Sequence, residues 1–199
     1  MIKSLIHYFS CALAAVLLLG SCSKEGPEDN GNNPVDLIAG RWDKTSALYT
    51  FGGQVLDIVA PPDEYFSLGD LSGLDFSTTG KVEMIYGPQS YTSIYYLKDS
   101  ELLLYGTVMD LVHIDEQELV FQEIINRMPL DQSVNPNLEE EIRADLVPVE
   151  KFCGKQVYED KNDPGYYSLF NEGCLLQCWR LPDGKGFYDG VHYSFTRKN

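Results

Sequence analysis

The chain has 199 residues, and its 15 lysines and arginines stand against 30 aspartates and glutamates, which gives a formal net charge of −15 at pH 7. Nucleic-acid binding depends on clustered basic side chains that neutralise phosphates, so this balance excludes a nucleic-acid partner. Anionic lipid headgroups would also repel the protein, and attachment to a membrane therefore requires a contact other than charge.

The first residues have the pattern of an export signal. Lys3 gives a weakly basic start, residues 11–19 form an apolar core, and residues 20–21 are small. The apolar core is about half as long as the roughly 20 residues that a transmembrane helix needs. The pattern therefore predicts a cleaved signal peptide rather than a membrane-spanning helix.

The end of this segment, Leu19-Gly-Ser-Cys22, resembles the lipobox of Gram-negative lipoproteins, at which the cysteine is diacylated and becomes the first residue. The resemblance implies a signal peptide over residues 1–21 and attachment of lipid, including palmitate, at Cys22. It also implies a location in the cell envelope, as an outer-membrane lipoprotein that faces the periplasm or the cell surface.

Residues 22–36 are predicted to be a flexible tether from the lipidated cysteine, because residues 23–34 contain no large apolar side chain to offset the entropy of ordering. Loss of residues 1–21 removes one basic residue, Lys3, and no acidic one, so the mature chain carries a net charge of −16. Residues 37–199 are predicted to form one domain with a single core.

The predicted domain has the pattern of an all-β protein, in which apolar and polar residues alternate in short runs between turn signals. In the last run, Val191, Tyr193 and Phe195 point one way, and the residues between them point the other. The predicted strands cover residues 37–48, 55–59, 74–76, 81–86, 91–97, 101–108, 111–114, 118–125, 174–181 and 187–196.

One segment of the long connection between strands has helical spacing. Leu138, Ile142 and Leu146 form an i, i+4, i+8 stripe, and Asn137 with Glu140 resembles a capping box. We expect a short helix that ends by residue 148. It could lie across the barrel mouth as a lid, or plug the bottom or pack outside as plain structure.

Three cysteines, Cys153, Cys174 and Cys178, remain in the predicted domain. Cys174 and Cys178 share a predicted strand, where four residues at about 3.3 Å each separate them by roughly 13 Å. A disulfide needs Cα atoms within about 7 Å, so these two should not pair. A disulfide from Cys153 to one of them and three reduced, buried thiols both remain open.

The sequence offers no catalytic or metal-binding motif. His113 and His192 each lie within a predicted strand, without a nearby nucleophile or metal-ligand spacing. Residues 160–165 resemble the start of a calcium loop, but Pro164 takes the fifth ligand position and Asn171 the twelfth, so a turn is favoured. The sequence therefore predicts a protein that is not an enzyme, with no metal and no cofactor.

The chain is rich in tyrosine, with 13 residues. An aromatic cavity or a sugar-stacking platform is one explanation, and ordinary β-sheet composition is the favoured one. The tyrosines gather in two groups: Tyr86, Tyr91, Tyr95, Tyr96 and Tyr105, and then Tyr158, Tyr166, Tyr167, Tyr188 and Tyr193.

The domain opens with Gly40-Arg41-Trp42, and this Gly-x-Trp at the head of the first strand resembles lipocalins. The successive hairpins, the bend at residues 115–119 and the ending at residues 193–198 resemble the lipocalin-like domains of secreted lipoproteins. The resemblance implies a single antiparallel β-barrel with a short inserted helix, whose closed end is covered by Trp42 against Arg197, or else Arg180. A β-sandwich is the alternative fold.

The predicted location in the cell envelope and the predicted fold imply a non-enzymatic lipoprotein that binds a small apolar or amphipathic ligand in its barrel. The alternative is an interaction or structural lipoprotein whose filled barrel contacts another cell-envelope protein. A barrel of about eight strands can hold one small ligand or be filled by side chains. An open, dry cavity would favour ligand binding, and a packed interior with an exposed apolar patch would favour the interaction protein.

Overall fold

The computed structural model describes residues 34–61, 66 and 68–198, most of them in strands. The predicted signal peptide, Cys22 and most of the predicted tether lie outside the described residues. Two short helices, α1 (Pro34–Ile38) and α2 (Leu138–Ala144), accompany the strands. Neither of them is long and apolar enough to cross a bilayer.

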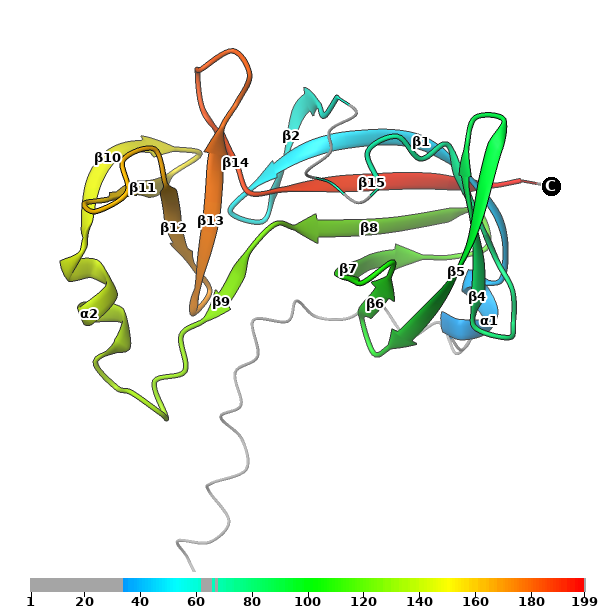
Figure 1. Cartoon of the computed structure of the whole chain (residues 1–199), viewed down its shortest axis with the longest axis horizontal. Helices are drawn as coiled ribbons and strands as arrows, with labels where there is room; N and C mark the ends of the chain where they lie inside the picture. Colours follow the sequence, from blue (N-terminus) through cyan, green and yellow to red (C-terminus); the bar gives the residue numbers. More distant parts are fainter. Residues whose placement is uncertain (1–33, 62–65, 67, 199) are drawn as a thin grey trace, which may run out of the picture.

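Eight strands form a closed antiparallel barrel (Figure 1). They follow the order β15–β8–β7–β6–β5–β4–β3–β1, and β1 pairs with β15, so the ring has no free edge. The predicted all-β fold with an antiparallel barrel is confirmed, in place of the β-sandwich. The barrel strands are β1 (Gly40–Phe51), β3 (Gly73–Phe76), β4 (Lys81–Tyr86), β5 (Gln89–Lys98), β6 (Glu101–Leu104), β7 (Thr107–Ile114), β8 (Glu118–Ile124) and β15 (Gly190–Arg197).

The alternation of side chains along β15 explains how the barrel forms its core. Val191, Tyr193 and Phe195 are buried, whereas His192 and Ser194 between them are only partly covered. Successive residues of a strand point to opposite faces, so one polar and one apolar face follow directly from the sequence. This predicted alternation is confirmed. A further strand, β2 (Gln54–Val59), pairs with the end of β1 outside the ring.

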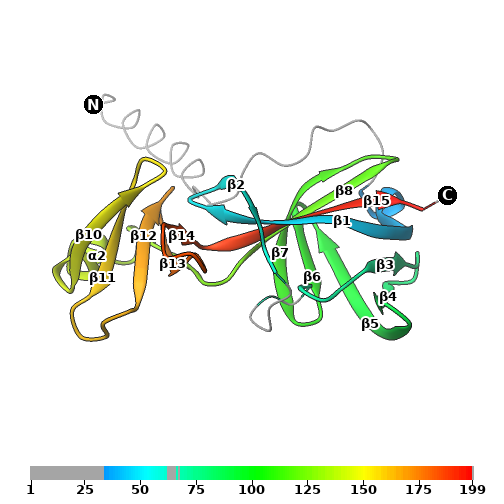
Figure 2. The same cartoon turned by 90° about the horizontal axis from the view of Figure 1, so that it is seen from above.

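A second sheet, which the sequence analysis does not predict, lies beside the barrel at the other end of the molecule (Figures 1 and 2). Its strands follow the order β10–β11–β12–β13–β14, and β9 also pairs with β13. They are β9 (Arg127–Pro129), β10 (Leu146–Phe152), β11 (Lys155–Asp160), β12 (Tyr167–Asn171), β13 (Cys174–Arg180) and β14 (Phe187–Tyr188).

The second sheet has a hydrophobic core of its own, which corrects the expectation of a single core. Phe51, at the end of β1, joins this core and so ties it to the barrel strands. Apolar residues of the sheet supply the rest: Val157, Leu169, Cys174, Leu176, Cys178 and Phe187. Residues 126–189 therefore form a second sheet beside the barrel, and none of their strands is part of the ring.

The predicted helix is present as α2, but it lies on the second sheet and not across the barrel mouth, so the lid placement is wrong (Figure 1). The guanidinium of Arg143 lies 3.8 Å from the ring centroid of Phe170 and donates to the Tyr158 hydroxyl at 2.7 Å. Asn137 makes no side-chain capping bond, and the helix ends before residue 146, which belongs to β10.

The barrel and the second sheet join where β15 begins, and a buried carboxylate organises this joint. The carboxylate of Asp189, which has no exposed surface, accepts from the Thr50 hydroxyl at 3.1 Å and the Gly52 N–H at 2.7 Å. The Asp189 N–H donates to the Thr50 carbonyl at 2.9 Å. A Cβ at the next residue, Gly190, would lie 2.2 Å from the Glu123 carbonyl oxygen, so only glycine fits there.

Replacement of Asp189 by asparagine tests the electrostatics of this joint. Burial raises the pKa of the Asp189 carboxyl to about 6, above the ordinary 3.8, against the opposing effect of its hydrogen bonds. The folded state therefore holds this proton more tightly, and the resulting stability is present below pH 4 and lost as pH rises through 6. The free energy of unfolding of the wild-type protein, relative to that of Asp189→Asn, should fall by about 2 kcal/mol between pH 4 and pH 7, measured by urea unfolding.

A difference between the two proteins that does not change with pH would contradict this assignment. Asp189→Ala is the companion variant, because it leaves the Gly52 N–H and the Thr50 hydroxyl without their acceptor. It should destabilise the protein by about 2 kcal/mol or more at both pH values.

Candidate functional site

Trp42 and Arg197 close one end of the barrel. They are direct partners in the β1–β15 register, and the Arg197 guanidinium lies 4.3 Å from the centre of the fully buried Trp42 ring. The indole N–H donates to the Ile38 carbonyl of α1 at 2.8 Å. Arg197 also donates to the carbonyls of Ala39 at 2.8 Å and Glu116 at 2.9 Å. A cation held against an aromatic face in this way fastens α1 over the barrel end.

The backbone conformation at Gly40 and the space around it both favour glycine over any other residue. Its φ is +118°, and a Cβ there would lie 2.8 Å from Nη1 of Arg197. The structure thus brings together Gly40, Trp42 and Arg197, the contact that the lipocalin resemblance implies. Arg180, the other candidate partner, lies over the rings of Tyr167 and Phe187 in the second sheet.

The interior of the barrel is filled by side chains. The buried residues of the described core that face it have at most 8% of their surface exposed, and a ligand-sized cavity among them would leave their surfaces accessible. Phe66, Leu68 and Leu71, from the β2–β3 connection, join the same core cluster. The packed side chains include Leu74, Phe76, Val82, Met84, Leu102, Leu104, Met109, Leu111, Leu119, Phe121, Tyr193 and Phe195.

An apolar surface runs across the outer wall of the same barrel. Tyr96, Leu103 and Val108 are direct neighbours across β5, β6 and β7, and Ile94 lies two residues before Tyr96 on the same face. Their exposed fractions lie between 41% and 76%. We name these four residues the β5–β7 strip. The next row on this face carries the charged residues Lys98, Glu101 and Asp110.

Arg127 lies between the barrel and the second sheet. Its guanidinium binds the Asp110 carboxylate through both terminal nitrogens, and each side chain is about one quarter exposed. Arg127 lines three cavities, of which two are large enough for a small molecule. One, of about 350 Å³, borders Val108 of the β5–β7 strip, and the other, of about 430 Å³, lies on the second sheet. No sequence motif marks Arg127, and the sequence analysis does not identify it.

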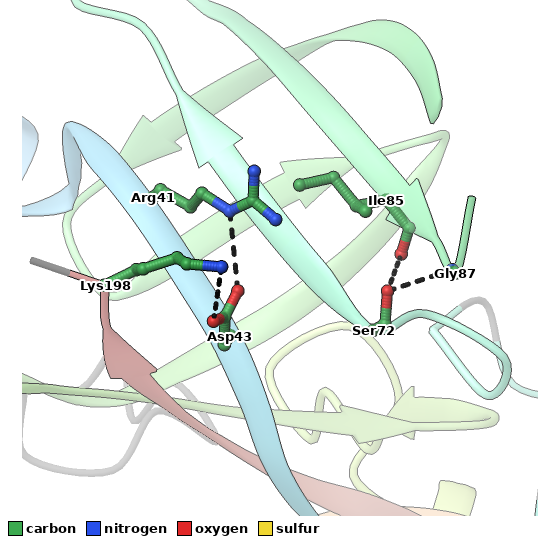
Figure 3. A network of polar contacts seen from close by, with 6 residues as sticks. All are labelled: Arg41, Asp43, Ser72, Ile85, Gly87 and Lys198. Carbon is green, nitrogen blue, oxygen red and sulfur yellow. Dashed lines mark hydrogen bonds and ion pairs between the residues drawn. The ribbon is translucent and has the colours of Figure 1, made fainter. Parts of the chain in front are cut away.

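The exposed charges beside β1 make ion pairs with one another (Figure 3). The Asp43 carboxylate lies 3.5 Å from Arg41 Nε and 3.4 Å from Lys198 Nζ, and all three side chains are 42–50% exposed. Nearby, the Ser72 hydroxyl donates to the Ile85 carbonyl at 2.8 Å. Exposed pairs of this kind contribute little stability.

The two histidines of the domain lie on different strands and face different partners. His113 Nε2 lies 3.2 Å from Asp115 in the β7–β8 turn, and His192 stands opposite Gln122 in the β15–β8 register. Backbone hydrogen bonds, first from the Gln117 N–H, lower the pKa of the Asp115 carboxyl. Across the described part of the chain, no three histidine, cysteine or acidic residues gather as metal ligands would.

Residues 161–166 form the turn between β11 and β12, as the sequence analysis favours over a calcium loop. The carboxylates at its base already have partners from the backbone. Asp160 accepts from the Asn162 N–H at 2.7 Å, and Glu159 accepts from the Gly165 N–H at 2.8 Å.

The cysteines depart from both expected arrangements. Cys153 and Cys178 are free thiols, so the possible disulfide from Cys153 is not formed. Cys153 is exposed at a φ of +45° in the β10–β11 turn, which also overturns the expectation of three buried thiols. Cys178 is buried in the second core, and burial raises the pKa of its thiol.

The tyrosines do not line one shared cavity. Tyr95 and Tyr96 are consecutive on β5, yet the first is buried in the barrel core and the second belongs to the exposed β5–β7 strip. Tyr49 and Tyr188 pack together with ring centroids 4.3 Å apart. The first group of tyrosines is therefore divided between the two faces of the barrel wall.

Comparison with known proteins identifies no relative. No family model matches the chain, and searches of the curated proteins and of the solved structures found no match. The function is accordingly argued from the side chains described above.

Truncation of Trp42 tests the closed end of the barrel. Trp42→Ala removes a fully buried indole and the surface on which Arg197 lies. It should lower the free energy of unfolding by about 3 to 5 kcal/mol, measured by urea denaturation. Tyr96→Ala, at a largely exposed ring, is the control and should cost less than about 1 kcal/mol. A loss below about 0.5 kcal/mol for Trp42→Ala would contradict a structural role for this residue.

Proposed function

We propose that this chain is a lipid-anchored, non-enzymatic lipoprotein of the cell envelope, whose filled barrel presents its outer wall to another envelope protein. The observation that carries the proposal is the combination of a packed interior with the exposed β5–β7 strip. The lipobox-like residues that end at Cys22 supply the proposed anchor, and the Gly40–Trp42–Arg197 contact supports the proposed lipocalin-like family.

The β5–β7 strip has the character of a protein interface. Its four side chains are contiguous across three strands, whereas isolated exposed apolar residues are common on any surface. Lys98, Glu101 and Asp110 border the strip with charges of both signs. An apolar centre with a polar rim is the usual organisation of a protein–protein contact, and aromatic side chains such as Tyr96 are enriched there.

A small ligand inside the barrel, the first function expected from the sequence, has less support. Side chains such as Phe121 and Leu102 have no exposed surface and would have to move before a ligand could enter. Close-packed interiors resist such rearrangement, so a ligand of this kind would compete with the core itself.

The position of α1 indicates how the domain would be oriented relative to the membrane if Cys22 carries the lipid. Ile38 of α1 accepts from Trp42 at the closed end of the barrel, so the chain enters the domain at that end. From Cys22 to the start of α1 at Pro34 the chain advances by 12 residues, which span at most about 40 Å when fully extended. The closed end would therefore lie within this distance of the membrane, and the barrel wall would remain accessible to a partner.

Replacement of Cys22 tests the anchor. In a Gram-negative host fed an alkynyl palmitate, Cys22→Ser should abolish labelling of the protein and leave an uncleaved precursor, because no thiol remains for the lipid. Cys153→Ser, which changes an exposed free thiol of the domain, should retain full labelling. Labelling of Cys22→Ser at the wild-type level would refute the anchor.

A photo-crosslinker at position 96 tests the interface. Benzoylphenylalanine in place of Tyr96 should give a discrete adduct with an envelope protein in living cells, identified by mass spectrometry. Leu103→Glu should remove the adduct, because it places a charge in the centre of the strip. The same probe at Tyr91, which is equally exposed but outside the strip, is the control. No adduct, an adduct of two copies of this chain, or equal adducts at both positions would contradict the proposal.

A further inference from the structure

The second sheet carries a groove on the face opposite its hydrophobic core. Ser168, Leu175, Gln177 and Met128 lie on the same face of β12, β13 and β9, and Tyr166 and Asn126 come directly before β12 and β9. On β13, the residues that point the other way are the core residues Cys174, Leu176 and Cys178. Together with Arg127, these six residues line a groove of about 430 Å³, within the size range of small-molecule sites.

A row of polar side chains runs across the floor of this groove. Ser168 and Gln177 are direct partners in the β12–β13 register. The Asn126 amide donates to the Gln177 side-chain oxygen, and the Gln177 N–H donates to the Asn126 carbonyl at 3.1 Å. Two amide groups and a hydroxyl therefore lie side by side, and each can both donate and accept hydrogen bonds.

The hydroxyl of Ser168 is the unexplained member of this row. The residue is 1% exposed, and its Oγ has no hydrogen-bond partner within the described residues. Buried polar side chains almost always have a partner, because an unpaired one loses its hydration without compensation. A ligand hydroxyl in the groove would supply that partner.

The surroundings of the row define the shape of the ligand. On one side lie Leu175 and Met128, which are direct partners across β13 and β9. On the other side is the half-exposed ring of Tyr166. Beyond Ser168 the row continues to its β11 neighbour Tyr158, whose hydroxyl accepts a hydrogen bond from Arg143 of α2. The helix thus covers the neighbouring strand and leaves the groove open.

Charge selects against an ionic ligand. Arg127 is the charged residue of the lining, and its guanidinium is already bound to Asp110. The chain as a whole carries a net charge of −15, which disfavours anions. A cation would find no carboxylate among the lining residues. The groove therefore fits a neutral molecule with many hydroxyls and an apolar face.

We propose that this groove is a binding site for a neutral carbohydrate of one or two sugar units. The sugar hydroxyls would bond to Ser168, Gln177 and Asn126, and its C–H face would pack on the Tyr166 ring. This site is separate from the β5–β7 strip, and its test succeeds or fails independently of the proposed envelope partner.

The test is isothermal titration of the purified full chain, in a zwitterionic detergent without a sugar headgroup, with maltose, cellobiose and N,N′-diacetylchitobiose. Digalacturonic acid serves as the anionic comparison. At least one neutral disaccharide should bind with a Kd of about 1 mM or tighter, and digalacturonic acid should bind at least about 10-fold more weakly.

Two variants assign the binding to the groove. Ser168→Ala and Tyr166→Ala should each weaken the binding by about 5-fold or more, and circular dichroism verifies that both fold. Tyr166 is largely outside the core, so its variant remains informative if Ser168→Ala does not fold. Ser90→Ala and Tyr91→Ala make the same chemical changes on the barrel and should have no effect. No saturable binding, or equal affinities in all variants, would overturn the proposal.

Discussion

The pairing of β1 with β15 is the constraint on which the rest of this structure depends. These strands come from opposite ends of the domain, and their register runs from Trp42 and Arg197 at one end to Thr50 and Gly190 at the other. The pairing closes the barrel, because β1 and β15 are the last two strands of the ring. It also carries Phe51 out of the barrel and into the second core, so that both cores depend on one ladder.

Each end of this ladder is fixed by a charged group in an unusual setting. At the closed end, the Arg197 guanidinium lies on a buried indole and binds backbone carbonyls. At the joint with the second sheet, the buried Asp189 carboxylate accepts hydrogen bonds from the Thr50 hydroxyl and the Gly52 N–H. Removal of Asp189 would leave the buried Thr50 hydroxyl and Gly52 N–H without an acceptor, which is costly.

The described side chains of the core fill the barrel, so both of the sites that we propose lie on the outside of the molecule. The barrel wall offers the β5–β7 strip, and the second sheet offers the groove around Ser168. Arg127 and Asp110 connect the two regions, since Asp110 stands in the row beside the strip and Arg127 lines the groove. The second sheet, rather than the barrel, is thus what distinguishes this chain from a simple barrel scaffold.

The sequence by itself determined the local features: the hairpins of β4 and β5, the two faces of β15, the helix near residue 138, and the Gly40–Trp42 start. These depend on residues close in the chain, whose periodicity and turn residues favour one local structure.

Only the tertiary structure decided that residues 146–171 form strands, because β10 is exposed over most of its length and contains Pro148 at an irregular pairing. Likewise, no local pattern distinguishes Ser168 from other strand serines, since its surroundings come from β9 and β13. The burial of a side chain and its partners on neighbouring strands depend on segments that are far apart in the sequence. They are therefore determined only when the chain has folded.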